Sequence, residues 1–316
     1  MTPASPAQPS PWKVALVLLI GILSVSTAAI FIRLAFQASG QTGIGFSLVL
    51  SASRLSIAAL VFLPAWRNVG KAINQAEQGD RPWLFSLGAG LSLAIHFACW
   101  ITSLSYTSIA ASTALVTTNP VWTALLSWLW WGDRPTRTMS LGIAIALLGS
   151  LLVSFADAAS TTVASQPLLG NGLALAGSWA ATLYLLLGRE AQQRGLEIGS
   201  HVVLTYSTAA IVLLPLPPLL GVGYGGYSAT VYLCMILIGL FPQTLGHTSL
   251  NWAVRWISPT LVTLTILAEP VGSSVLGILV FRENPGAQVW LGAAVILAGV
   301  AIAVLSARSA KQPSKA

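Results

Sequence analysis

Charged residues are scarce in this sequence. Only 7% of its 316 residues are Asp, Glu, Lys or Arg, whereas 55% are apolar. A soluble globular domain carries about 25% charged residues, because its water-facing surface has to be solvated. A chain with so little charge cannot cover itself against water, so its outer surface must face lipid. The composition therefore excludes a water-soluble protein.

Cysteine and histidine are also scarce, with two and three copies. Cys99 and Cys234 both fall within apolar runs, where small hydrophobic packing is their usual role, so no disulfide is predicted. The sequence contains neither an H-E-x-x-H metal motif nor a G-x-S-x-G nucleophile motif. We therefore predict no catalytic residue, no metal site and no cofactor, and an intramembrane enzyme is disfavoured.

Long apolar runs fill nearly the whole chain. A membrane-spanning helix needs about 20 mostly apolar residues. Ten such runs are predicted: 14–36, 45–63, 84–104, 108–131, 139–156, 169–188, 201–220, 229–250, 258–281 and 288–306. The first is too long, and too weakly basic at its start, for a secretory signal, so we expect a retained helix. The fold class predicted is an all-α membrane protein with ten transmembrane helices.

The basic residues between these runs are distributed unevenly. Twelve fall on the side of the first tail: Lys13, Arg67, Lys71, Arg81, Arg134, Arg137, Arg189, Arg194, Arg255, Arg308, Lys311 and Lys315. Only Arg33 and Arg282 fall on the other side, while Arg54 lies inside a run. By the positive-inside rule both termini are predicted to be cytoplasmic, in an integral inner (plasma) membrane protein. The net charge of +7 is then topogenic, and no nucleic-acid partner is expected.

The sequence also repeats itself. With a shift of 150 residues, "NPVWTALLSWLWWGDRPTRTMSLGIAIALLG" from 119 aligns with "EPVGSSVLGILVFRENPGAQVWLGAAVILAG" from 269 without a gap. With a shift of 151, His96 aligns with His247. Each copy holds five runs, and because five is odd the second copy enters the membrane from the opposite side. Inverted repeats of this kind are typical of secondary transporters.

The repeat divides the chain into five parts. These are a cytoplasmic tail (1–13), a first five-helix repeat (14–156), a linker (157–168), a second, inverted repeat (169–306) and a cytoplasmic tail (307–316). Both repeats close with a proline, an acidic residue and a second proline before a glycine-rich run. In this pattern the chain resembles the EamA family of the drug/metabolite transporter superfamily. The resemblance implies ten helices, a central cavity between the halves, and export or exchange of small metabolites.

Polar residues inside a membrane usually face the bundle interior or a water-filled cavity. Gln243, His247 and Asn251 are spaced four apart and predict one polar stripe on a helix. His96 and Trp100 share a face by the same spacing. Substrate-pathway candidates also include Asn119, Trp179, Tyr184 and Tyr206. Packing and interhelical hydrogen bonding are the alternative for each of them.

Arg54 lies in the middle of a run, where a charge is costly, so it should find an acceptor. Glu269, Asn119 or carbonyls freed near Pro120 are the candidates, and Arg54 is predicted to be a structural lock between helices. An anion-binding role is the alternative.

Asn119–Pro120 and Glu269–Pro270 occupy the same position in the two halves. Proline removes a helical hydrogen bond, so kinks are predicted at Pro120 and Pro270. Interrupted helices at matching places are a pointer to a transporter's binding site. A carboxyl group in a low-dielectric site resists ionisation, which makes Glu269 a proton-coupling candidate; a structural partner of Arg54 is the alternative.

Together these features predict a secondary transporter that exports or exchanges small organic metabolites, amino-acid-like or amphiphilic, by alternating access. Its partners are then the lipid bilayer, a small-molecule substrate and, if transport is coupled, protons. A passive facilitator and a sugar-phosphate or nucleotide-sugar antiporter stay open as alternatives. Small residues along 142–149 and 292–303 predict close helix packing, which either braces each repeat or supports a homodimer.

Overall fold

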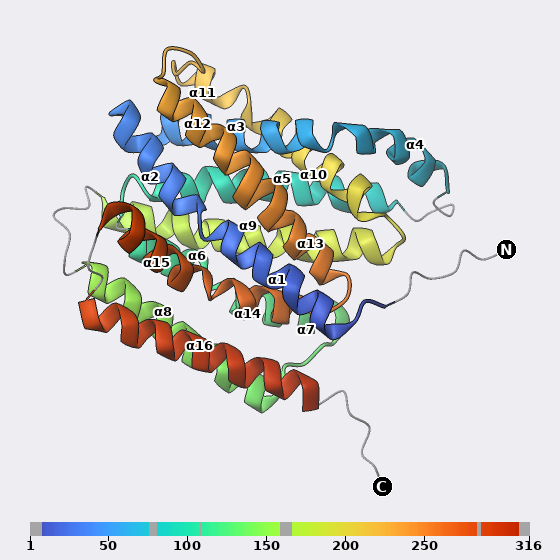
Figure 1. The fold of residues 1–316 in the computed structure, drawn as a ribbon. Helices are drawn as coiled ribbons and strands as arrows, with labels where there is room; N and C mark the ends of the chain where they lie inside the picture. Colours follow the sequence, from blue (N-terminus) through green and yellow to red (C-terminus); the bar gives the residue numbers. More distant parts are fainter. Residues whose placement is uncertain (1–7, 76–80, 108, 159–165, 283–285, 310–316) are drawn as a thin grey trace, which may run out of the picture.

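The computed structural model describes residues 8–75, 81–107, 109–158, 166–282 and 286–309, and these ranges contain helices but no strand (Figure 1). The helices lie side by side with similar axes, and α1 (Pro11–Val25) begins at the end of the bundle where α16 (Gly286–Ser309) finishes (Figure 1). At that end α1 starts next to Lys13, α8 starts at Arg137 and α9 stops just before Arg194, so we call it the basic end.

The helices of the first half are α1 (Pro11–Val25), α2 (Ala28–Ser39), α3 (Ile44–Val61), η1 (Leu63–Ala65), α4 (Trp66–Gln75), α5 (Pro82–Ser103), α6 (Ile109–Val116), α7 (Asn119–Trp131) and α8 (Arg137–Ala158). Those of the second half are α9 (Pro167–Gln193), α10 (Ile198–Leu213), α11 (Leu216–Leu219), α12 (Ala229–Ile238), η2 (Gly239–His247), α13 (Thr248–Val254), α14 (Pro259–Ile266), α15 (Glu269–Phe281) and α16 (Gly286–Ser309).

Seven helical segments in the described part of the chain are long and apolar enough to cross a membrane. They are Pro11–Ser39, Ile44–Val61, Pro82–Ser103, Leu168–Gln193, Ile198–Leu219, Ala229–Val254 and Pro259–Phe281. Each coincides with a predicted run. The remaining predicted runs are helical as well, as α6 with α7, as α8 and as α16. The predicted all-α membrane class is confirmed, whereas a count of ten spans goes beyond this result.

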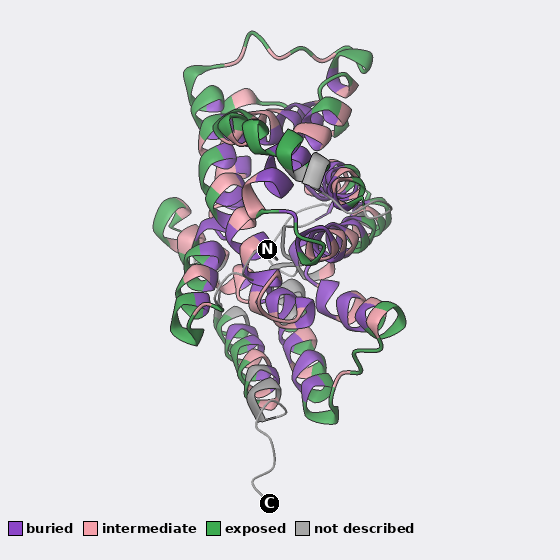
Figure 2. Ribbon diagram, turned by 90° about the vertical axis from the view of Figure 1, so that its right-hand side faces the viewer, coloured by how far each residue is buried: buried purple, intermediate pink, exposed green. Residues whose placement is uncertain are grey.

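The outside of the bundle is apolar. Seen from the basic end, the helices turn their buried faces inward and their exposed faces outward (Figure 2). Those outer faces carry large aliphatic side chains, and Leu129, Ile211 and Leu279 are each about two-thirds exposed. Water would oppose such a surface, because each exposed aliphatic side chain costs about 1.5–3 kcal/mol relative to burial. A lipid environment removes that cost.

The small residues of α8 and α16 pack these two helices against each other. A Cβ atom added to Gly142 would lie 2.7 Å from the carbonyl oxygen of Gly299, and one added to Gly299 would lie 2.4 Å from the amide nitrogen of Ala146. Such distances leave room for hydrogen only. The two small-residue stripes therefore face one another within one chain and join the last helices of the two halves.

Three membrane-embedded helices are interrupted. α1 gives way to α2 at Ser26–Thr27, α6 to α7 at residues 117–118, and α14 to α15 at residues 267–268. The last two breaks match, since α7 begins at 119 and α15 at 269, an offset of 150 residues. Pro120 and Pro270 are each the second residue after their break, where a missing amide proton is tolerated. Neither proline can donate to the carbonyl four residues earlier, which explains why each helix starts anew.

A fourth irregularity separates α12 from α13. Residues 239–247 form a π-helix with Pro242 inside it, where sequence periodicity predicts an ordinary helix. A proline interrupts the regular hydrogen-bond ladder, and a wider turn accommodates the interruption. Gly239 lets this segment approach Ile57 of α3, and Gly246 lets it approach Val25 of α1.

Candidate functional site

A cavity of about 50 Å³ lies where the three helix breaks meet. Its wall consists of Val25, Ala28, Arg54, His96, Phe97, Trp100, Val116, Thr117, Asn119, Ala181, Tyr184, Leu185, His247, Leu250, Ile266 and Glu269. Val25 and Ala28 flank the first break, Val116 and Asn119 the second, and Ile266 and Glu269 the third. Because a free water molecule needs about 10–15 Å³ in this measure, the cavity has room for a few.

Arg54 is the cation of this cavity. Its side chain, only 1% exposed, projects from α3 with the guanidinium 3.9 Å from the centre of the Phe97 ring. Nε donates a hydrogen bond of 2.7 Å to Oε1 of Gln243 in the π-helical segment. The acceptor is therefore none of those that the sequence suggested. No hydrogen bond or ion pair joins Arg54 to Glu269 or Asn119 in the described residues, although all three line the same cavity.

Two histidines from equivalent places in the two halves meet at the cavity. The rings of His96 and His247 lie 6.4 Å apart. Nδ1 of His96 lies 2.9 Å from the Gly177 carbonyl, which can only accept, so Nδ1 donates and a neutral ring presents Nε2 as an acceptor. Trp100 stacks beside His96 with ring centres 6.0 Å apart and planes within 8°. The predicted shared face of His96 and Trp100 is thus a wall of the cavity.

Several polar atoms at the cavity are buried without a hydrogen-bond partner among the described residues. They are Nη1 of Arg54, Nε1 of Trp100, Oδ1 of Asn119, Nδ1 of His247 and, just behind the wall, Nε2 of Gln243. Buried polar groups are nearly always paired, and an unpaired one costs about 1–3 kcal/mol. A concentration of such atoms at one place indicates a site that a polar ligand or water completes.

Asn119 and Glu269 occupy equivalent places, each as the first residue of the helix that follows a break. The second break therefore offers an amide to the cavity, and the third a carboxylate. The α1–α2 break braces the carboxylate's helix, because the hydroxyl of Ser273 donates to the Ser26 carbonyl at 3.0 Å. Among the described residues of the wall, the guanidinium of Arg54 and the carboxylate of Glu269 thus come from opposite halves of the chain.

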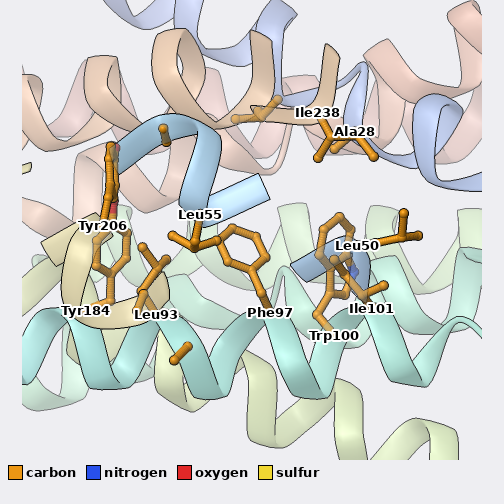
Figure 3. Packing of buried hydrophobic residues seen from close by; sticks show 14 of the residues in the cluster. Ala28, Leu50, Leu55, Leu93, Phe97, Trp100, Ile101, Tyr184, Tyr206 and Ile238 are labelled. Carbon is orange, nitrogen blue, oxygen red and sulfur yellow. The ribbon is translucent and has the colours of Figure 1, made fainter. Parts of the chain in front are cut away.

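The other sequence-predicted residues lie at different distances from the cavity. Tyr184 is in its wall, and its hydroxyl accepts a hydrogen bond from the Asn251 amide just behind the wall. Tyr206 lies next to Tyr184 (Figure 3), is fully buried and bonds through its hydroxyl to Thr248 at 3.0 Å. Gln243 is outside the wall and contacts the wall residue Arg54 through its side-chain oxygen.

Trp179 does not reach the cavity. Its side chain is 56% exposed on the outer face of α9, and its ring lies 4.8 Å from that of Trp122. Five residues separate it from Tyr184, so the two point to different sides of the helix. Trp179 therefore lies outside the wall of this cavity.

His201 is a buried polar residue that sequence reasoning missed. It is fully buried near the start of α10 and contacts Ser86, Thr205 and Asn251. The shift of 151 that aligns His96 with His247 sets His201 against Leu50, so the repeat gave no signal. The signal that could have found it is a polar residue at the very start of the predicted run 201–220. In the described part of the chain, no three His, Cys, Asp or Glu residues group as metal ligands do.

Comparison with known proteins connects this geometry to transport. The sequence profile described as the EamA-like transporter family matches residues 12–155 and 168–305. A probable terminal-alkyne amino-acid exporter of Streptantibioticus cattleyicolor is 25% identical over 287 residues, with 90% of each chain covered. The uncharacterized transporter YdfC of Bacillus subtilis is 26% identical, with 72% of each chain covered.

A solved crystal structure shares the fold. It aligns with a TM-score of 0.74 at 20% sequence identity and covers 96% of this chain and all of its own. The family profile spans most of the sequence, and the apolar helices provide the multi-pass membrane character that it requires. The chain belongs to the EamA-like transporter family.

Proposed function

We propose that the chain is a secondary transporter of ten membrane-spanning helices, arranged as two inverted five-helix repeats with both termini in the cytoplasm. The matched breaks at 117–118 and 267–268 support the repeat. The gathering of basic residues at the end where α1 begins supports the orientation, by the positive-inside rule.

The proposed substrate is a small amino-acid-like metabolite. The cluster of unpartnered polar atoms at the cavity is the observation that carries this proposal. Nη1 of Arg54 is placed to donate to a carboxylate, and the carboxylate of Glu269 and Oδ1 of Asn119 are placed to accept from an ammonium group. A zwitterion satisfies both sets at once, whereas a phosphate needs several cations and the wall has one.

The apolar part of the wall fits the rest of such a molecule. Phe97, Trp100, Leu185 and Ile266 supply aromatic and aliphatic contact area between the polar groups. The name of the Streptantibioticus cattleyicolor relative, a probable exporter of terminal-alkyne amino acids, supports the same substrate class.

Glu269 gives the transporter a means of coupling to protons. A proton and a substrate ammonium group compete for the same carboxylate, so each displaces the other. Alternating access then exchanges substrate for protons, because the kinked helices α14–α15 repack according to which one is bound. An inward proton gradient then drives export of the substrate by this exchange.

The experiment that tests the proposal is flux in proteoliposomes. Purified protein is first screened by thermal shift against amino acids, their amides and their decarboxylated amines. Hits are then loaded into liposomes, with and without a pH gradient. We expect stabilisation by intact amino acids, weaker stabilisation by analogues that lack either charge, and faster flux with the gradient. Binding of amides as tight as that of acids contradicts the assigned role of Arg54.

Cysteine accessibility tests the topology. In a background with Cys99 and Cys234 replaced by Ala, single cysteines at Arg67, Arg134 and Arg194 should react with an impermeant reagent only from the cytoplasm. A cysteine at Gly223 should react only from outside. If positions 67 and 223 react from the same side, the inverted repeat is wrong.

A further inference from the structure

A second group of buried polar residues lies between the cavity and the basic end. Its members are Ser86 of α5, Gln192 of α9, His201 and Thr205 of α10, and Asn251 of α13, and each is at most 1% exposed. We call this group the basic-end cluster. It joins one helix of the first half to three of the second, and Ser86, Gln192 and His201 lie within the last five residues of their helices at the basic end.

Hydrogen bonds run through the basic-end cluster in one direction. The amide nitrogen of Asn251 donates to Tyr184 and to the His247 carbonyl, so its Oδ1 is free to accept from Nε2 of His201 at 3.3 Å. Nδ1 of that neutral ring then accepts from the hydroxyl of Ser86 at 2.9 Å. The chain of bonds ends at Tyr184, a residue of the cavity wall.

Other bonds tighten the same contact. The side chain of Gln192 donates to the Asn251 carbonyl at 2.9 Å and so ties the end of α9 to α13. Thr205 donates to the Ser86 carbonyl at 3.2 Å and ties α10 to α5. Four helices are therefore held together at one level, on the side of the cavity that faces the basic end.

Gly188 of α9 makes this closure possible. A Cβ atom at this position would lie 2.9 Å from Nε2 of His201 and 3.1 Å from Oδ1 of Asn251. Any side chain there would press against the hydrogen-bonded pair. The missing side chain lets α9 close over the contact between His201 and Asn251.

The equivalent positions in the first half lack this chemistry. With the shift of 151, His201 corresponds to Leu50 and Asn251 to Trp100. Leu50 is buried in the apolar core, and Nε1 of Trp100 has no partner among the described residues. The hydrogen-bonded closure therefore belongs to the basic end and has no counterpart at those two positions.

We propose that the contact of His201 with Asn251, covered by Gly188, is the gate that closes the transport pathway toward the basic end. The inference rests on the proposed alternating-access function. Polar side chains inside a membrane usually face the bundle interior or a water-filled cavity, and they mark substrate pathways. When α9 and α10 move away from α5 and α13, these side chains line the open path, and Tyr184 connects the gate to the occupant of the cavity.

The test measures access to the cavity from each side of the membrane. The reporter is Ala181→Cys on the cavity wall, in full-length protein with Cys99 and Cys234 replaced by Ala. An impermeant thiol reagent is applied to vesicles of either orientation, and Arg134→Cys identifies the basic side. Asn251→Leu and Gly188→Ala are each expected to raise labelling of the reporter from the basic side about tenfold, since the first removes the partner of His201 and the second pushes the hydrogen-bonded pair apart in the closed state.

Gly188→Ala keeps the test decisive if Asn251→Leu does not fold, because alanine favours a helix interior more than glycine does. Ser103→Ala is the matched control: it removes a buried 2.6 Å bond to Ser112 at the far end of α5. Labelling that rises equally from both sides, or equally in Ser103→Ala, overturns the gate and leaves His201 a packing residue. Unchanged labelling overturns it as well.

Flux separates this inference from the proposed function. If wild-type protein moves no amino acid while Gly188→Ala still opens the basic side, the gate stands and the substrate assignment is wrong. If flux is present and side-selective labelling is absent, the gate is wrong and the transport function stands.

Discussion

The two halves of the molecule repeat a backbone but divide the chemistry. The pairs α6–α7 and α14–α15 break at the same place, with an eight-residue helix followed by a thirteen-residue helix that carries proline at its second position. The side chains at these matched places differ. The first half supplies Arg54 and Asn119, whereas the equivalent positions of the second half hold Thr205 and Glu269.

Under the proposed function, this difference lets a symmetric frame hold an asymmetric amino acid. The cavity obtains its cation from one half and its carboxylate from the other, so the site is complete only where the halves face each other. The irregular helices divide in the same way, since α1–α2 is broken only in the first half and the π-helical segment occurs only in the second. The equivalent helices α9 and α5 are continuous.

Removal of Arg54, the cation that the first half supplies to the cavity, should have the largest effect. Arg54→Leu is expected to weaken binding of amino-acid substrates by roughly 10- to 100-fold, because a hydrogen bond to a charged group is worth about 1.5–3 kcal/mol. Thermal unfolding should shift downward only modestly, since removal of a buried charge offsets the loss of the bond to Gln243. Ligand-induced thermal shift and proteoliposome flux measure the two effects.

Arg33→Leu is the matched control, because Arg33 also lies over an aromatic ring, that of Phe281, but away from the cavity. Loss of folding in Arg54→Leu, with binding intact in a stabilised background, makes Arg54 a lock between the halves and not an anion site.

The contact between the last helices of the two halves is the next target. Gly299→Ala should lower the free energy of unfolding by about 1–3 kcal/mol, because its Cβ meets backbone atoms of α8 that cannot move aside. Gly277→Ala has open space around its Cβ and should be neutral or slightly stabilising. Denaturation in detergent measures both variants. Equal stability of the two excludes a role for close α8–α16 packing.

A smaller effect is expected at Glu269, the carboxylate that the second half supplies to the cavity. Glu269→Gln keeps shape and hydrogen bonding but removes titration and negative charge. We expect it to fold, to bind amino acids about tenfold more weakly, and to exchange substrate for substrate with no response to a pH gradient. Flux with and without the gradient measures this. A pH-driven rate equal to that of wild type makes Glu269 a structural residue.

The frame of the molecule was predictable from the sequence because its signals are periodic. Hydrophobic length located the helices, and the register of Pro120 with Pro270 located two of the breaks. Most predicted pathway residues came to the cavity for the same reason, since spacing and alignment fix which side of a helix a residue occupies. The α1–α2 break at Ser26–Thr27 carries no proline and was not predicted.

Contacts between distant segments could not be predicted. Arg54 bonds to Gln243, 189 residues away, because the π-helical turn around Pro242 brings that amide toward α3. Spacing on an ordinary helix does not encode this displacement. His201 was missed for a related reason: its partners Ser86 and Asn251 come from other helices, and only their packing shows that the group is connected.

The smallest effect is expected at Trp179, the predicted pathway residue that lies outside the cavity wall. Trp179→Leu should change amino-acid flux by less than about twofold, because its ring faces outward against Trp122 and their contact is worth about 0.5–1.5 kcal/mol of stability. Trp100→Leu should reduce flux clearly, since that ring lines the cavity, stacks on His96 and has a free Nε1. Both variants are compared in the same liposomes at matched protein content. If Trp179→Leu impairs flux as much as Trp100→Leu does, the substrate pathway runs along the outer face of α9 and the cavity is not its centre.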